Sequence, residues 1–182
     1  MVYDQRRLNM AYSAIAVANA FIEKAKKLGI SDISPMKIQK LVYFAHAWML
    51  AAEDRPLIDE PVMAWKFGPV IQSIYHEFKG YGSGNITSPG TIFEHDENAN
   101  SIIKMRFVAP EIPDSDKDAL SIVDAILDVY GDKSAFFLSN LTHEHGSAWQ
   151  VTSELHHNGC EKGYVIPNEV IKRTTKNELG LV

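Results

Sequence analysis

One long apolar stripe, between residues 34 and 53, does most to limit the folds open to this sequence. Ser34 followed by Pro35 is a typical helix start, because the serine hydroxyl caps the first turn and proline has no N–H to lose there. Apolar side chains then recur at steps of three and four residues: Ile38, Leu41, Val42, Ala45, Trp48, Met49 and Ala52. This spacing predicts a helix with one buried face, against which the other elements pack.

A break at Gly68-Pro69 separates this helix from a second apolar pattern. We predict that a new helix begins directly after the break and ends near Gly80. Its buried side would consist of Val70, Ile71, Ile74, Tyr75 and Phe78. Between the two helices, residues 62–65 are too short for a helix and indicate a strand.

The remaining pattern completes a mainly α fold. Residues 81–101 are rich in Gly, Asn and Ser and predict a long loop, and residues 102–108 predict a strand that pairs with residues 62–66. Further helices are predicted at residues 11–28, at 116–130 with Ser115 as the cap, at 135–143 after Ser134, at 148–156 and at 167–178. We therefore expect one compact domain over residues 1–182, with about five to seven helices and a small two-stranded β-sheet.

Charge and cysteine content exclude several classes of protein. The chain of 182 residues has a net charge of -5, so no general positive field draws it to nucleic acid. A single cysteine, Cys160, cannot form an internal disulfide framework and suits a reducing cytoplasm. No apolar run approaches the length of about 18 residues that a membrane span needs. We expect a cytoplasmic protein with neither membrane nor nucleic acid as a partner.

The densest group of potential metal ligands lies near the carboxyl end of the chain: His143, His145, His156, His157 and Cys160. Zinc needs three or four such ligands in a tetrahedral shell, and this spacing matches no zinc signature. Surface histidines are the preferred interpretation, so we predict no catalytic residue, no metal and no cofactor. A small metal-dependent enzyme that uses the region of His143 and His145 is kept as an alternative.

Two motif blocks give the sequence its resemblance to a known family. The first block is Lys37-x-x-Lys40-Leu41-x-Tyr43-Phe44-Ala45-His46, followed by Pro56-Leu57, Ala64-Trp65-x-x-Gly68-Pro69-Val70 and Tyr75. The second is Leu138-Ser139-x-x-Thr142-His143 with Ser147-x-Trp149. Together they resemble the Panacea domain family, which includes SocA-like antitoxins and GepA-like phage-associated proteins. The resemblance covers residues 10–152, leaves 153–182 as a carboxyl-terminal extension, and has Ala148 where the family has proline.

The resemblance implies a helical domain without known catalytic activity, whose members bind and neutralise a toxin encoded nearby. One type delivers its toxin to a protease, so a cellular protease is a second expected partner. A phage-associated regulator without a cognate toxin is the other alternative. On this basis, we expect a toxin segment to lie in a groove beside residues 38–52 and 65–78.

The motif residues have two open interpretations, as scaffold or as direct contacts to the partner. They are Lys40, Tyr43, His46, Trp65, Gly68, Pro69, Val70, Tyr75, Thr142, His143 and Trp149.

Overall fold

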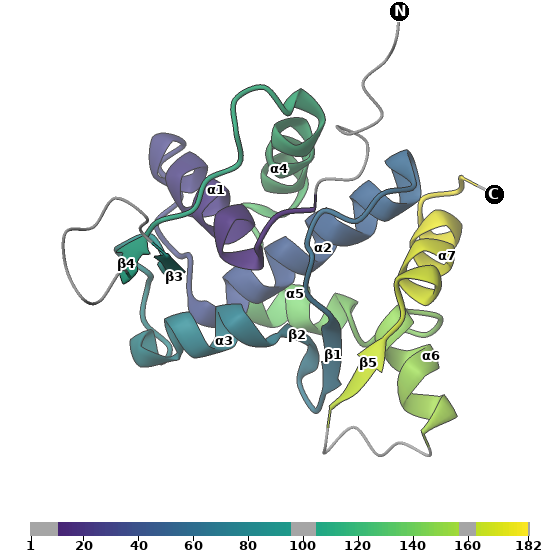
Figure 1. Ribbon diagram of the computed structural model, residues 1–182. Helices are drawn as coiled ribbons and strands as arrows, with labels where there is room; N and C mark the ends of the chain where they lie inside the picture. Colours follow the sequence, from purple (N-terminus) through teal and green to yellow (C-terminus); the bar gives the residue numbers. More distant parts are fainter. Residues whose placement is uncertain (1–10, 96–104, 157–162, 182) are drawn as a thin grey trace, which may run out of the picture.

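Helix α2 (Pro35–Glu53) forms the centre of the fold, and five other helices contact it (Figure 1). The protein is described here from a computed structural model that covers residues 11–95, 105–156 and 163–181. As predicted, Ser34 caps α2, with its hydroxyl accepting the Lys37 N–H at 3.3 Å. From residue 37 to residue 47 every side chain of α2 is buried. The helix is thus enclosed on nearly all sides, which goes beyond the single buried face that the spacing predicts.

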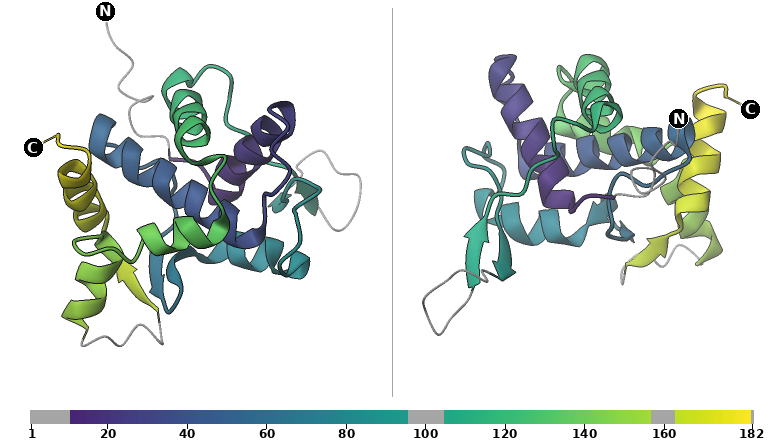
Figure 2. Two further views of the ribbon diagram at one scale, coloured as in Figure 1. Left: turned by 180° about the vertical axis from the view of Figure 1, so that it is seen from behind. Right: turned by 45° about the horizontal axis from the view of Figure 1, so that its top comes forward.

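The described residues contain seven α-helices, so the prediction of a mainly α fold is confirmed. Figure 2 shows α5 lying against α2 on the rear side, and α7 packs along the same helix. No helix in the described part of the chain has both the length and the hydropathy of a membrane span. In chain order the helices are α1 (Ala14–Lys27), α2, α3 (Gln72–Phe78), the 3-10 turn η2 (Lys79–Tyr81), α4 (Lys117–Tyr130), α5 (Ala135–Leu141), α6 (Ala148–Leu155) and α7 (Asn168–Glu178).

A small antiparallel sheet lies beside α2, with strand order β2-β1-β5. Its strands are β1 (Val62–Trp65), β2 (Gly68–Ile71) and β5 (Tyr164–Ile166). The strand predicted at residues 62–65 is confirmed, and its partner β5 was not predicted. Three residues are too few to give an alternating pattern that sequence analysis could detect.

The prediction that a helix begins directly after Gly68-Pro69 is wrong. Residues 68–71 form β2 instead, and α3 begins at Gln72. Val70 and Ile71 are β-branched residues that suit a strand as well as a buried helix face, and here pairing with β1 decides. The side-chain amide of Gln39 adds two bonds of 2.9 Å to the backbone N–H and C=O of Ile71, so it continues the ladder beyond β2.

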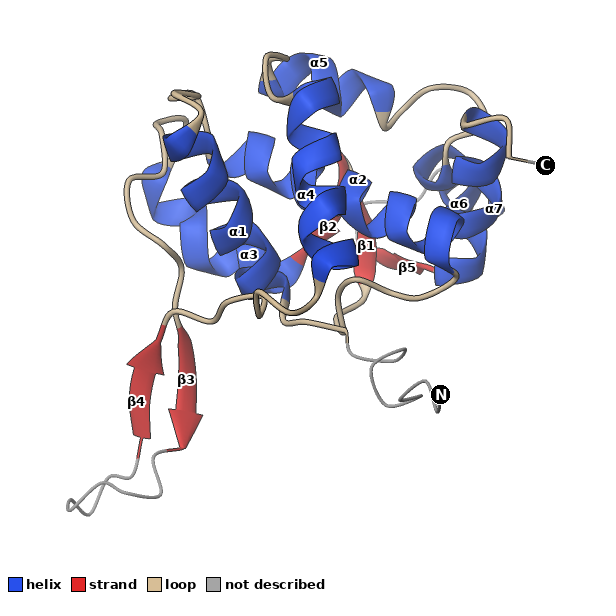
Figure 3. Cartoon of the chain, turned by 90° about the horizontal axis from the view of Figure 1, so that it is seen from above, coloured by secondary structure: helices blue, strands red, loops and turns tan. Residues whose placement is uncertain are grey.

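A second hairpin, β3 (Ile92–His95) with β4 (Met105–Val108), projects from the body of the molecule (Figure 3). The long loop predicted at residues 81–101 is therefore wrong at residues 92–95. The predicted pairing of residues 102–108 with residues 62–66 is also wrong, because β2 and β5 already occupy both edges of β1.

A buried polar cluster joins the start of the described chain to α4. Asp116, not the predicted Ser115, caps α4 by accepting the Ala119 N–H at 3.1 Å. The same carboxylate accepts the Tyr12 hydroxyl at 2.6 Å and the Arg55 guanidinium at 3.0 and 3.1 Å. Burial by itself raises the pKa of Asp116, but these hydrogen bonds and the charge of Arg55 hold it below its ordinary value overall.

Candidate functional site

Side chains from two helices hold the turn between β1 and β2 by its backbone carbonyls. The Lys40 amine on α2 donates to the carbonyls of Phe67 and Pro69 at 2.9 and 3.2 Å. The Ser139 hydroxyl on α5 lies 3.4 Å from the same Phe67 carbonyl. The Phe67 carbonyl lies in the turn and the Pro69 carbonyl in β2, and the side chains of Lys40 and Ser139 supply the hydrogen-bond donors that buried backbone carbonyls need.

A third helix contributes an aromatic donor. The Trp149 indole N–H on α6 donates to the Trp65 carbonyl at 2.7 Å. The Trp149 ring also packs against His143, with ring centroids 4.1 Å apart, and the Trp65 ring meets Tyr75 edge-on at 5.1 Å. We call Lys40, Ser139 and Trp149 the hairpin anchor. It fixes the conformation of the turn from three directions.

Gly68 allows the anchor to approach this closely. Its φ of +99° lies outside the conformations that residues with a Cβ adopt readily. A Cβ here would lie 2.5 Å from the Lys40 amine, 2.7 Å from Thr142 Oγ1 and 3.2 Å from the His143 ring. Thr142 and His143 are in turn hydrogen-bonded to the Ser139 carbonyl, each at 2.7 Å. The structure thus brings residues of both motif blocks into one contact region: Lys40, Trp65, Gly68, Pro69, Ser139, Thr142, His143 and Trp149.

Burial makes the Lys40 amine an unusual member of this region. Its side chain is 2% exposed and its hydrogen-bond acceptors are neutral carbonyls. Removing a charged amine from water favours its neutral form, and the pKa of Lys40 falls from 10.5 to about 7. The Lys40 amine therefore gives up its proton far more readily in the folded protein than in the unfolded chain.

This shift gives an expected dependence of stability on pH. Between pH 7 and pH 9 unfolded Lys40 still binds its proton while folded Lys40 releases it, so the free energy of unfolding should rise by about 2 kcal/mol. Urea denaturation at several pH values measures the rise, and Lys40→Met should flatten it. Lys26→Met, at an exposed position, is the control that should keep it. A Lys40→Met protein with the full rise would contradict this origin.

Two other predicted motif residues of α2 have interior roles. Tyr43 is 5% exposed, and burial raises the pKa of its hydroxyl well above the ordinary value. The fully buried His46 accepts the backbone N–H groups of Leu57 and Ile58 at Nδ1, so Nε2 carries the proton and donates to Asn168 at 3.0 Å. Burial lowers the pKa of His46 to about 4, although the bond to Asn168 acts in the opposite direction. His46 therefore joins α2 to α7 as a neutral ring.

The candidate metal ligands are not gathered in the part of the chain that the structure describes. Within it, no group of three or more His, Cys, Asp or Glu side chains is placed to hold a metal ion. His143 packs on Trp149, His145 is exposed, and His156 stacks on Tyr164 with ring centroids 3.7 Å apart. The other two candidates, His157 and Cys160, lie outside the described residues.

A groove of ≈ 440 Å³ opens between the β1–β2 hairpin, the first turns of α2 and helix α3. Because three aromatic side chains line it, we call it the aromatic groove. Its apolar residues are Pro35, Met36, Trp65, Phe67, Val70 and Tyr75. Two of the predicted motif residues that are not enclosed in the core, Trp65 and Tyr75, thus lie in its wall.

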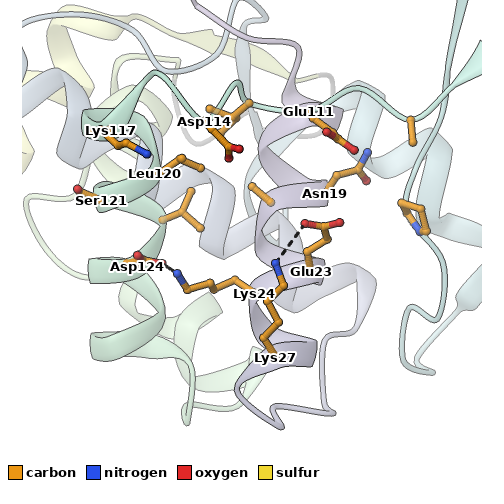
Figure 4. Close-up of a pocket in the computed structure, with 15 residues that line it drawn as sticks. Asn19, Glu23, Lys24, Lys27, Glu111, Asp114, Lys117, Leu120, Ser121 and Asp124 are labelled. Atoms are coloured by element: carbon orange, nitrogen blue, oxygen red, sulfur yellow. Dashed lines mark ion pairs between the residues drawn. The ribbon is translucent and has the colours of Figure 1, made fainter.

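A second cavity, of ≈ 410 Å³, lies between α1 and α4 (Figure 4). Its rim is charged with both signs, and two pairs of charges are already joined. Lys24 contacts Asp124 at 2.6 Å, and Lys27 contacts Glu23 at 3.8 Å. Paired charges of mixed sign give this cavity no preference for one charge of ligand, so the aromatic groove is the better candidate site.

Sequence analysis did not place Gln39 or Ser139 among the candidate site residues. Both are polar, buried and bonded to the hairpin backbone. The signal that could have found them is a polar residue at a position where the helical spacing demands burial.

Comparisons with known proteins agree on one family. Residues 38–150 match the family model described as "Antitoxin SocA-like, Panacea domain", a range that contains the whole hairpin anchor. Antitoxin SocA of Caulobacter vibrioides (strain NA1000 / CB15N) is 32% identical over 159 residues, which cover 87% of this chain and 80% of that protein. No solved structure gives a significant match. The chain therefore belongs to the family of SocA-like antitoxins with a Panacea domain.

Proposed function

We propose that this protein is an antitoxin that neutralises a cognate toxin by binding it directly. The observation that carries the proposal is Phe67, an aromatic side chain that is 68% exposed at the tip of a turn whose backbone is fixed by the hairpin anchor. Exposed aromatic side chains that adjoin other apolar residues, as Phe67 does in the aromatic groove, mark candidate centres of protein interfaces. Family membership supports the same class of function, and no catalytic step is needed for it. The partner would be encoded beside this protein and meet it in the cytoplasm.

The test is growth of cells that express the adjacent reading frame with and without this protein, followed by copurification. Toxicity that is relieved together with a stable complex supports neutralisation by binding. Loss of the toxin from cells without a stable complex would instead support a protease adaptor. A harmless neighbour that never copurifies would contradict the proposal.

Phe67→Ala is expected to leave folding intact and weaken the complex. Because Phe67 is mostly exposed, its removal should change the free energy of unfolding by no more than about 0.5 kcal/mol. Truncation of a central interface aromatic costs about 2 kcal/mol of binding free energy, a loss of about 30-fold in affinity. Calorimetric titration of the purified partner measures it.

Phe107→Ala is the matched control for this experiment. Phe107 is 73% exposed, like Phe67, but it lies on the projecting β3–β4 hairpin. It should leave the affinity within about twofold. Equal losses from both changes would argue against a contact centred on the β1–β2 turn.

A further inference from the structure

The charges around the aromatic groove differ from those of the chain as a whole. The protein has a net charge of -5, yet two exposed lysines, Lys66 and Lys79, line the groove beside the buried Lys40. No Asp or Glu is among its described lining residues. Lys66 and Lys79 are both exposed, and within the described residues neither forms an ion pair. The groove is therefore a local positive surface on an acidic protein.

The shape of the groove suits a protein segment better than a small molecule. Small ligands usually have 70–90% of their surface buried, in pockets of about 300–1,000 Å³. The volume here is ≈ 440 Å³, but the walls are themselves open to solvent: Met36 is 44% exposed, Phe67 68% and Tyr75 42%. A shallow groove of this kind buries one or two anchoring side chains of a longer chain that continues across the surface.

The hairpin anchor prepares the groove for binding. Trp65 and Phe67 belong to the hairpin whose carbonyls accept from Lys40 and Trp149, so the backbone that carries these two rings keeps its position without a partner. A surface that is ordered in advance loses less conformational freedom on binding. The wall can therefore act as a fixed recognition surface.

We propose that the aromatic groove binds an acidic segment of the toxin, in which one aromatic or large aliphatic side chain is flanked by Asp or Glu. The apolar side chain lies between Trp65, Phe67 and Tyr75, and the flanking carboxylates face Lys66 and Lys79. This assignment rests on the proposed antitoxin function and adds to it the location and the chemistry of the contact.

The test uses charge reversal in the full-length protein against the purified product of the adjacent reading frame. Lys66→Glu combined with Lys79→Glu is expected to lower the affinity at least 30-fold, because attraction becomes repulsion at both ends of the segment. Lys26→Glu combined with Lys27→Glu makes the same change in net charge on α1, away from the groove, and should change affinity less than threefold. The native affinity should also fall as salt is raised.

Short overlapping peptides from the same partner identify the segment. The expected result is that the bound peptides are acidic, contain an aromatic or large aliphatic residue, and lose binding to the Lys66→Glu, Lys79→Glu protein. If the Lys66→Glu, Lys79→Glu protein binds the partner with native affinity, or if the bound segment is basic, the groove assignment is overturned while the antitoxin function stays in place. Failure of the native protein to bind the partner at all would overturn the function and the groove assignment together.

Discussion

Gly68→Ala is expected to lower the free energy of unfolding by about 4 kcal/mol, the sum of backbone strain and overpacking at a single position. The strain arises because alanine does not readily adopt a φ of +99°. The overpacking arises because Thr142 is short, buried and bonded to the Ser139 carbonyl, so it cannot move away from the new methyl group. Lys40 can move only by giving up its bonds to the turn. Thermal or urea denaturation measures the loss.

Gly146→Ala separates the two contributions to this loss. Gly146 also has a positive φ, +86°, but no atom lies within 4 Å of the position its Cβ would take. It should therefore show the strain alone, about 1–3 kcal/mol. Equal losses at Gly68 and Gly146 would mean that the close approach of Lys40 and Thr142 to the turn has no energetic consequence.

Asp116→Ala is expected to cost about 2–3 kcal/mol, because it removes the hydrogen bonds of a partly buried carboxylate to Arg55 and Tyr12 together with the cap of α4. Arg55, 7% exposed, and the Tyr12 hydroxyl both lose their bond to this side chain, and α4 loses its cap. Asp116→Asn keeps an equally good cap without the charge and should fall between the native protein and alanine. Since the folded pKa of Asp116 is lowered, its contribution is present above the unfolded value of 3.8 and is lost as the pH falls below it.

Asp54→Ala is the control for Asp116→Ala. Asp54 forms an exposed ion pair with Lys172, and such pairs contribute little to the stability of a fold. Urea denaturation of the native protein and the three variants at pH 7 ranks the four stabilities. If Asp54→Ala and Asp116→Ala lower the free energy of unfolding equally, the cluster of Tyr12, Arg55 and Asp116 contributes no more to stability than a surface ion pair.

The helices could be predicted because their signals are local. Ser34 and Ser134 each accept an N–H three residues later, as their position before an apolar run indicates. The prediction fails at Gly68-Pro69, where the next residues fit a strand and a helix equally well. Their pairing with residues 62–65 decides between the two, and pairing is a property of the folded chain rather than of a short segment.

The composition of the site could be predicted only as a list of residues. Lys40, Gly68 and Trp149 all stand in the motif blocks, yet nothing in the sequence shows that they meet at one turn. The bond from Trp149 to the Trp65 carbonyl joins positions 84 apart, and the bond from Tyr12 to Asp116 joins positions 104 apart. Hydrogen bonds between such distant positions leave no periodic trace, so their roles emerge only once the helices are packed.

Strand β5 and helix α7 show that the range of a family match does not define where a protein can be truncated. The match ends at residue 150, within α6, but β5 occupies one edge of β1 and Asn168 bonds to His46 in the interior. A protein shortened to the matched range would expose that strand edge, and open edges are templates for aggregation. The segment that follows the family match thus covers a strand edge that could otherwise pair with other copies of the protein.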